Sequence, residues 1–212
     1  MFYTIRPPFL LSRIIYPTLQ WRYKTNDKVI YLTFDDGPIP NITPWVLAQL
    51  AAYNAQATFF CIGDNVQKNP TIYQQLVDSG HKIGNHTQHH CNGWATDTAT
   101  YLADIATCDS LVQSNLFRPP YGRISKAQIK ALLVDKKIPN ITQIIMWDTL
   151  SGDFDTQISP KQCLANVIRN ARSGSIVVFH DSEKAFPNLV YALPRVLAHF
   201  SNLGYRFGVI GT

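Results

Sequence analysis

The feature that most constrains the fold is the repeated alternation of short β-rich runs with longer segments of helical spacing. Strands are expected at 28–34, 57–62, 81–85, 116–118, 143–147, 175–179 and 205–210. Helices are expected at 43–53, 69–80, 97–114, 125–136, 159–171 and 189–203, the first with Thr43 as N-cap and Pro44 in the first helical position. Repeated strand-then-helix order implies right-handed crossovers and a parallel sheet. About seven such units predict an α/β barrel rather than an open sheet.

The chain is expected to form one well-filled domain at residues 28–212, preceded by an apolar arm at 1–27. It has 212 residues, of which 46% are hydrophobic and 16% charged. The apolar stretch 8–17 contains Arg13 and ends at Pro17, and no small-residue cleavage site follows, so it is a poor signal peptide. The sequence contains no run of 18 apolar residues, so no transmembrane segment is expected. We expect the arm to pack on the domain or to make peripheral contact with a membrane, and the sequence leaves a cytoplasmic and a cell-envelope location open.

Charge and cysteine content exclude some partners. The formal net charge is +5, but lysine and arginine are scattered along the chain, so no nucleic-acid binding is expected. The positive charge is only a weak indication that the protein binds an anionic polymer. The four cysteines are Cys61, Cys91, Cys108 and Cys163, and they form no C-x-x-C pair. Free, buried thiols are preferred to two disulfides, and the oligomeric state is left open.

The polar residues with catalytic potential fall just after predicted strands. They are Asp35, Asp36, His86, His90, Arg118, Asp153, His180 and Asp181. In parallel α/β folds the carboxyl ends of the strands converge on one face, where active sites form. We therefore expect these side chains to meet at one rim.

The adjacent carboxylates Asp35 and Asp36 and the histidines of His86–Thr87–Gln88–His89–His90 predict a metal site. Two neighbouring carboxylates resist joint ionisation unless a cation lies close, so one can bind metal while the other remains a base. His86 and His90 are spaced i and i+4, and on a helical turn they would share a face. His89 and Cys91 are competing ligands by chemistry. Two histidines and one carboxylate leave coordination positions open, as in catalytic zinc sites.

Two further segments supply an arginine and a histidine. Arg118 stands in a rigid Arg–Pro–Pro–Tyr–Gly turn and could orient a carboxylate. His180 ends a buried strand and could act as a general acid near neutral pH. Asp153 could raise the pKa of His180, with Asp148 and Asp155 as alternative partners.

Four motifs in this order resemble the polysaccharide deacetylase family, the NodB-homology domain of carbohydrate esterase family four. They are Thr33–Phe34–Asp35–Asp36–Gly37–Pro38, His86–Thr87–Gln88–His89–His90, Arg118–Pro119–Pro120–Tyr121–Gly122 and Phe179–His180–Asp181. The resemblance extends from about residue 28 to the C-terminus. It implies a distorted (β/α) barrel with about seven parallel strands. It also implies one divalent metal ion, most simply zinc, and removal of acetyl groups from N-acetylglucosamine units of peptidoglycan or a chitin-like glycan.

The resemblance also implies a role for each residue. Asp35 would be the general base, oriented by Arg118, and the Tyr121 backbone N–H would be an oxyanion donor. His180 would be the general acid, tuned by Asp153. The metal ligands would be Asp36, His86 and His90. One departure is Phe154, which follows Asp153 where the family usually has tryptophan and which lacks an indole N–H donor.

Three alternative functions stay open. O-deacetylation of a glycan would use the same groups, and a related fold could hydrolyse small cyclic amides. An inactive sugar-binding module would be expected to have lost Asp35, a metal ligand or His180, yet all of these are present. Trp94 and Trp147 are expected either to stack on sugar rings or to lie in the core.

Overall fold

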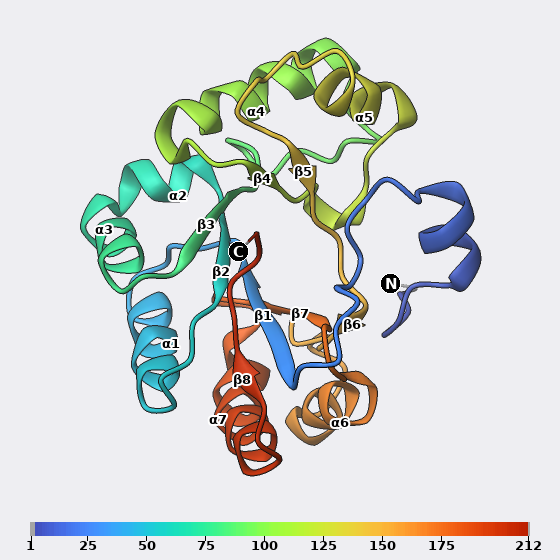
Figure 1. The fold of residues 1–212 in the computed structure, drawn as a ribbon. Coiled ribbons are helices and arrows are strands. Elements are labelled where there is room, and N and C mark those ends of the chain that lie inside the picture. The colour runs from blue at the N-terminus through green and yellow to red at the C-terminus, as the bar shows by residue number, and fades with distance from the viewer. Residues whose placement is uncertain (1–2, 212) are drawn as a thin grey trace.

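The computed structural model describes residues 3–211, and within them every strand pair is parallel. The strands are β1 (Val29–Asp35), β2 (Thr58–Cys61), β3 (Lys82–Asn85), β4 (Leu116–Phe117), β5 (Gln143–Ile144), β6 (Thr149–Leu150), β7 (Ile176–His180) and β8 (Arg206–Phe207). Their order is β5-β4-β3-β2-β1-β7-β6, with β8 beside the start of β1. The seven strands from β5 to β6 in this order curl into a half-barrel (Figure 1), which confirms the predicted distorted barrel.

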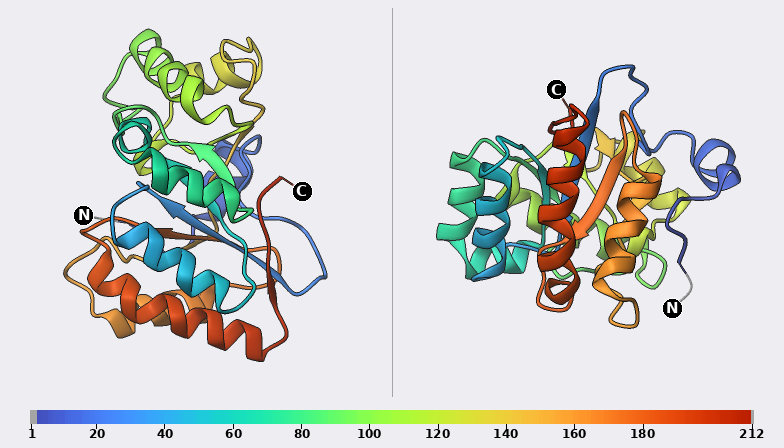
Figure 2. Two further views of the ribbon diagram at one scale, coloured as in Figure 1. Left: turned by 90° about the vertical axis from the view of Figure 1, so that its left-hand side faces the viewer. Right: turned by 90° about the horizontal axis from the view of Figure 1, so that it is seen from below.

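Helices cover the outer face of this sheet, as the two turned views show (Figure 2). They are α1 (Ile42–Ala51), α2 (Gly63–Lys68), α3 (Pro70–Asp78), α4 (Thr98–Val112), α5 (Lys126–Leu133), α6 (Pro160–Asn170) and α7 (Phe186–Asn202). The apolar side of α7 packs on the sheet, with Leu189, Leu193 and Val196 fully buried. Burial of one such side chain stabilises the fold by about 1.5–3 kcal/mol.

The centre of the sheet fixes the relative positions of two predicted catalytic residues. Phe34 of β1 stacks on Phe59 of β2 and Phe179 of β7, with ring centroids 5.0 and 6.0 Å apart. The β1–β7 register pairs Asp35 with His180. Close packing of aromatic rings resists slippage of this register, because a shift of one residue would turn each ring to the other face. The packing of the core therefore holds Asp35 and His180 side by side at the carboxyl edge.

Helix starts were predicted well where a polar side chain caps its own helix. The side chains of Asp97, Ser125 and Ser159 accept hydrogen bonds from backbone N–H groups of the first turns of α4, α5 and α6. The prediction for α1 was wrong, because Asn41 is its N-cap and Thr43 lies inside the helix. The Thr43 Oγ1 accepts the Ile39 N–H at 2.8 Å and its hydroxyl donates to the buried side chain of Asp181, so it does not cap the helix. The six-residue helix α2 was not predicted.

The N-terminal arm fills the opening between β5 and the β6–β7 pair (Figure 1). On one side, Gln20 exchanges backbone hydrogen bonds with Ile144 and Met146 at 2.9 and 2.8 Å. On the other, Tyr23 N–H donates to Gly174 O at 2.9 Å, and Leu150 N–H donates to Ile5 O at 2.8 Å. These bonds satisfy backbone groups that an open sheet edge would leave to water. The arm therefore packs on the barrel, while the domain boundary at residue 27 stays a prediction.

Two other expectations concern helix length and thiols. Among residues 3–211, no helix combines the length and apolar character needed to cross a bilayer. All four cysteines lie in this range and are free thiols. Cys61, Cys108 and Cys163 are buried as expected, but Cys91 is only partly buried.

Candidate active site and metal centre

Asp35 is held by a buried ion pair with Arg118. The Arg118 Nη1 group donates to Asp35 Oδ1 and to Thr33 Oγ1, both at 2.7 Å. Its other nitrogens donate to the carbonyls of Ile145 and Met146 at 3.3 and 3.0 Å. Burial acts to raise the pKa of Asp35, but the neighbouring charges, foremost the Arg118 guanidinium, hold that pKa below its ordinary value. Asp35 is therefore an ionised carboxylate in a fixed orientation.

Asp36, His86 and His90 bring three ligand atoms within 4.8 Å of one another. Asp36 Oδ1 lies 3.8 Å from His86 Nε2 and 3.3 Å from His90 Nε2. The same Oδ1 atom is buried and has no hydrogen-bond partner among the described residues. A buried carboxylate oxygen without a donor is costly unless a cation lies beside it. The three residues therefore fit a divalent ion.

The helical turn expected for His86 and His90 was wrong. The segment after β3 is an irregular loop in which Thr87 and His90 have φ angles of 67° and 57°. Thr87 Oγ1 accepts the Cys91 backbone N–H at 3.1 Å, which closes this loop. The loop still brings the imidazole rings of His86 and His90 together, with centroids 5.1 Å apart.

The Nε2 atoms of both histidines lie near Asp36, and burial favours the neutral form of both rings. The His86 Nδ1–H donates to Arg118 O at 2.8 Å, which leaves Nε2 as the ligand atom. His90 Nδ1 lies 3.1 Å from the Tyr121 hydroxyl and likewise turns Nε2 toward Asp36. Burial lowers the pKa of His86 to about 4 and is also the main cause that lowers the pKa of His90. Neutral imidazole is the form that binds metal.

The alternative ligands lie outside this cluster. His89 is largely exposed and pairs through Nδ1 with Asp104, while its Nε2 lies 3.8 Å from Asp64. Asp104 also accepts the backbone N–H groups of Gln88 and His89 at 3.0 and 3.1 Å. Asp104 thus anchors the ligand loop from outside the metal site.

His180 is paired with Asp153. The Nδ1 atom of His180 lies 2.8 Å from Asp153 Oδ1, and its backbone N–H donates to Asp153 Oδ2 at 2.7 Å. Asp148 instead accepts from Ser175 and the Ile176 N–H, and Asp155 accepts from Tyr3 and Gln157. Burial acts to lower the pKa of His180, but the Asp153 carboxylate outweighs it and raises this pKa to about 10. His180 is therefore protonated at neutral pH.

These groups surround one cavity of about 420 Å³. Asp35, Asp36, His86, His90 and His180 all line it. The lining also includes Tyr121, Trp147 and Phe154, together with Tyr3 from the arm. The edge of Phe154 meets the His180 ring at 5.2 Å between centroids. Trp94 is 64% exposed and lines a neighbouring cavity instead.

The sequence reasoning gave no structural role to three residues that shape this site, although it placed Asp181 at the rim. Thr33 shares Arg118 with Asp35, and its position two residues earlier on the same strand face was a readable signal. Asp181 accepts from the Gly37 N–H at 3.1 Å, and a Cβ atom at Gly37 would lie only 2.0 Å from its Oδ2. Tyr3 reaches the cavity wall through a hydrogen bond to Asp155 and a ring contact with Phe154 at 5.1 Å. No local pattern signals these last two contacts, which join distant segments.

Comparison with known proteins adds independent findings. A family model described as "Polysaccharide deacetylase" matches residues 22–134. A peptidoglycan-N-acetylglucosamine deacetylase of Bacillus cereus is 36% identical over 205 residues, covering 93% of this chain and 94% of that protein. The crystal structure of the Bc1960 peptidoglycan N-acetylglucosamine deacetylase is similar, with a TM-score of 0.82, 28% identity and coverage of 94% of each chain.

A third similar protein is a family 4 acetyl xylan esterase from Clostridium thermocellum, whose structure contains a cobalt ion. It has a TM-score of 0.75 and 28% identity, covering 86% of this chain and 88% of that chain.

Proposed function

The chain belongs to the polysaccharide deacetylase family, and from this premise we propose that it is a metal-dependent N-deacetylase acting on N-acetylglucosamine units of peptidoglycan. One observation carries the proposal. A single cavity joins a three-residue ligand set, an ionised carboxylate fixed by arginine and a protonated histidine fixed by a carboxylate. Hydrolysis of an amide needs activation of water, stabilisation of an oxyanion and a proton for the leaving amine.

Asp36, His86 and His90 would hold the metal, for which we propose zinc. Two imidazole nitrogens and one carboxylate suit zinc and leave positions open for water and substrate. When bound, such an ion lowers the pKa of water and polarises a carbonyl oxygen. The cobalt ion in the related acetyl xylan esterase supports a divalent ion here.

Asp35 would remove the proton from water as it attacks the acetyl carbonyl carbon. Its lowered pKa keeps it ionised, and Arg118 fixes the direction of its carboxylate. Arg118 would restrain Asp35 without touching substrate, because its side chain is fully buried behind the carboxylate. The Tyr121 backbone N–H would donate to the oxyanion, an interaction that is worth about 2.7–4 kcal/mol in other enzymes.

His180 would protonate the amine as the carbon–nitrogen bond breaks. The products are acetate and a free amino sugar, so one water molecule is consumed for each acetyl group. Asp153 keeps His180 charged and holds its ring through Nδ1, which leaves Nε2 to deliver the proton. This arrangement matches a general acid that works at and above neutral pH.

Peptidoglycan is proposed as substrate because the Bacillus cereus relative with that activity aligns along nearly the whole chain. Chitin-like oligomers carry the same N-acetylglucosamine unit. O-deacetylation is the second candidate, and the similarity to an acetyl xylan esterase favours it. The peripheral membrane contact expected for the arm is independent of this chemistry.

Acetate release tests these substrates directly. Purified protein, with and without added zinc, is incubated with peptidoglycan glycan strands, chitooligosaccharides, acetylated xylan and a cyclic ureide. Zinc-dependent acetate release from the first two substrates is expected. Activity on acetylated xylan alone would replace the proposal with an O-deacetylase, and ureide hydrolysis alone with a cyclic amidase. Specific sugar binding without acetate release would indicate an inactive binding module.

A further inference from the structure

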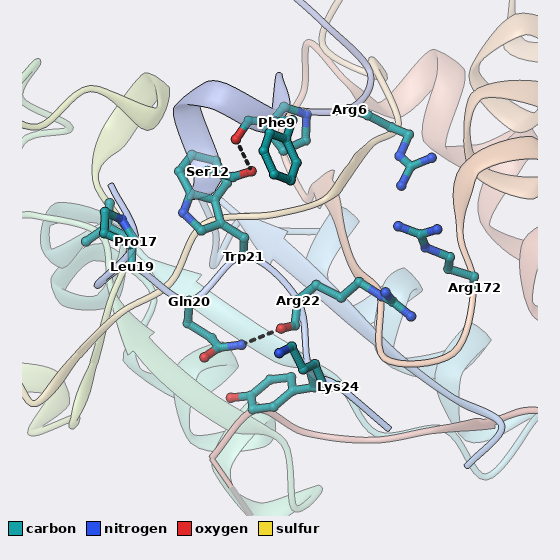
Figure 3. A pocket seen from close by; sticks show the side chains of 12 residues that line it. Arg6, Phe9, Ser12, Pro17, Leu19, Gln20, Trp21, Arg22, Lys24 and Arg172 are labelled. Carbon is teal, nitrogen blue, oxygen red and sulfur yellow. Dashed lines mark hydrogen bonds between the residues drawn. The ribbon is translucent and has the colours of Figure 1, made fainter. Parts of the chain in front are cut away.

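A second cavity, of about 890 Å³, lies between the N-terminal arm and the start of β7. It shares no lining residue with the active-site cavity. Arg172 lies ahead of β7, whereas His180 ends that strand, so the two cavities lie toward opposite ends of β7. Four cationic side chains line the second cavity, and Figure 3 shows their arrangement: Arg6, Arg22, Lys24 and Arg172.

These four cations are only partly balanced, by one neighbouring acid, Asp148. No carboxylate lines the cavity within the described residues. Arg22 donates to the Ser173 carbonyl through Nε and Nη2, and only its Nε atom approaches an acid, Asp148, at 3.8 Å. Arg6, Lys24 and Arg172 form no salt bridge with any acid in residues 3–211. A concave group in which four cations face one acid favours binding of an anion.

The crowding of like charges is visible at Arg172. Burial is the largest cause that lowers the pKa of its guanidinium, repulsion from Arg22 and Arg6 lowers it further, and attraction to Asp148 offsets part of this effect. The Arg6 and Arg172 guanidinium groups point toward each other in Figure 3. An anionic oxygen between them would relieve this repulsion and accept hydrogen bonds from both. Phosphate has the charge and the oxygen geometry for this position.

The arm beside the cavity also exposes apolar side chains in a short stretch. Phe9, Leu10, Ile14 and Ile15 are 73, 56, 61 and 41% exposed. They lie on and around the short π-helix Leu11–Ile15, which projects from the barrel (Figures 1 and 2). Phe9 lines the basic cavity as well, so the apolar and cationic groups are contiguous. Clustered exposed apolar groups next to cations are typical of segments that lie in a membrane interface.

We propose that the arm and this basic cavity bind the surface of an anionic phospholipid membrane. Lipid phosphates would lie among Arg6, Arg22 and Arg172, and the apolar side chains of the arm would enter the interface. A soluble anionic polymer accounts for the cations but gives no role to Phe9 or Ile14. The membrane surface satisfies both features. Binding there would leave the active-site cavity open, because the two cavities share no residue.

Co-sedimentation of the full chain with vesicles tests this proposal without any substrate, so it does not depend on the proposed function. We expect binding to vesicles of phosphatidylcholine and phosphatidylglycerol at a ~3:1 ratio to be at least ~10-fold tighter than to phosphatidylcholine alone. Each cation near such a surface contributes about fivefold, so Arg6→Gln with Arg172→Gln should weaken binding about 25-fold. Phe9→Ser with Ile14→Ser should also weaken it.

Matched controls place the same changes elsewhere. Val134→Ser removes an apolar side chain that is 69% exposed, and Lys161→Gln removes an exposed cation of α6. Both should bind vesicles like the unmodified chain. All variants should keep the circular dichroism spectrum and the unfolding temperature of the unmodified chain, which shows that the fold is intact.

Four results would overturn the proposal. Equal affinity for the two kinds of vesicle, or no affinity for either, would show that the protein does not recognise anionic lipid. Unchanged binding after substitution of Arg6 and Arg172 would show that the cavity is not the binding site. Displacement by soluble polyphosphate, with no loss on substitution of Phe9 and Ile14, would indicate a polymer site instead. Binding of inorganic phosphate without vesicle binding would equally exclude a membrane surface.

Discussion

The two oxygens of the Asp153 carboxylate hold His180 from two directions, one through the ring Nδ1 at 2.8 Å and the other through the backbone N–H at 2.7 Å. The carboxylate therefore fixes both the position and the charge of the imidazole. Asn188 in turn donates to the Asp153 carbonyl at 3.0 Å, which ties this pair to α7. The pair is a rigid unit of strand, loop and helix.

The first prediction concerns the alkaline limb of the pH profile. Because the pKa of His180 is raised, the proton is present at neutral pH and is lost only as pH rises through the raised value. Asp153→Asn removes the charge that raises it, so the alkaline limb of kcat should move to lower pH. The measurement is kcat against pH with metal content checked, and Asp155→Asn is the matched control that should leave the limb in place.

His180→Ala should lower kcat by ~10²–10⁴-fold. A near-normal kcat in that variant would exclude the acid role.

Metal content is the second prediction. We expect one divalent ion per chain, removed by a chelator together with activity and restored by zinc. His86→Ala with His90→Ala should abolish the stoichiometric ion, because both Nε2 ligand atoms are lost. His89→Ala is the control, since its ring pairs with Asp104 outside the cluster. Elemental analysis of untagged protein decides the matter, and retention of one ion in the double variant would disprove this ligand set.

The third prediction separates the two adjacent carboxylates. Asp35→Asn should abolish acetate release but keep the metal, because Asp35 is paired with Arg118 and lies outside the ligand set. Asp36→Asn should lower metal affinity, because Asp36 Oδ1 faces both histidines. Metal titration and acetate assays on both variants measure the two effects. The opposite pattern would show that the two roles are reversed.

Arg118 is expected to matter for stability as well as activity. Arg118→Met removes the buried partner of Asp35 and leaves a carboxylate without compensation, which typically costs about 3–5 kcal/mol. Denaturant unfolding should report this loss in the free energy of unfolding, and Arg195→Met at an exposed position of α7 should change little. Addition of Asp35→Asn to Arg118→Met should recover part of the lost stability. If the double variant were no more stable than Arg118→Met, the uncompensated charge would not be the cause.

Acidity should affect the same ion pair in a defined direction. The folded pKa of Asp35 is lower than its ordinary value, so its ionisation stabilises the fold above the ordinary pKa. This contribution is lost as pH falls toward the folded value. Unfolding free energies measured between neutral and acid pH should fall less steeply in Asp35→Asn, with Asp78→Asn at an exposed position as control. An equal slope in the unmodified chain and in Asp35→Asn would contradict the lowered pKa of Asp35 in the folded protein.

The parts of the fold that the sequence predicted are those determined by neighbouring residues. Asp97, Ser125 and Ser159 cap their own helices, and each helix start was readable from the first turn. Thr43 looked like a cap, but its oxygen accepts the Ile39 N–H and its hydroxyl donates to Asp181, which is 138 positions away in the chain. Such a contact overrides local preference and leaves no mark in the local pattern.

The candidate site shows the same division. The i, i+4 spacing predicted that His86 and His90 act as a pair, yet the loop that joins them has residues with positive φ angles rather than a helical turn. The contribution of Tyr3 to the cavity wall depends on how the arm crosses the barrel, which no motif encodes.

The closure of the half-barrel by the arm also affects how the chain can reach its native state. The arm is made before its partners near residues 144–146 and 173–175, which follow more than a hundred residues later in the chain. Closing so long a loop is entropically costly, and contacts of this separation slow folding. Leu19 and Trp21 are buried in the finished barrel in a core cluster whose other members all lie between residues 101 and 146, so they lack this surface until that part of the chain is made. During synthesis the arm is therefore an exposed apolar segment until its partners are made, which makes it a natural substrate for chaperones that bind unfolded chains.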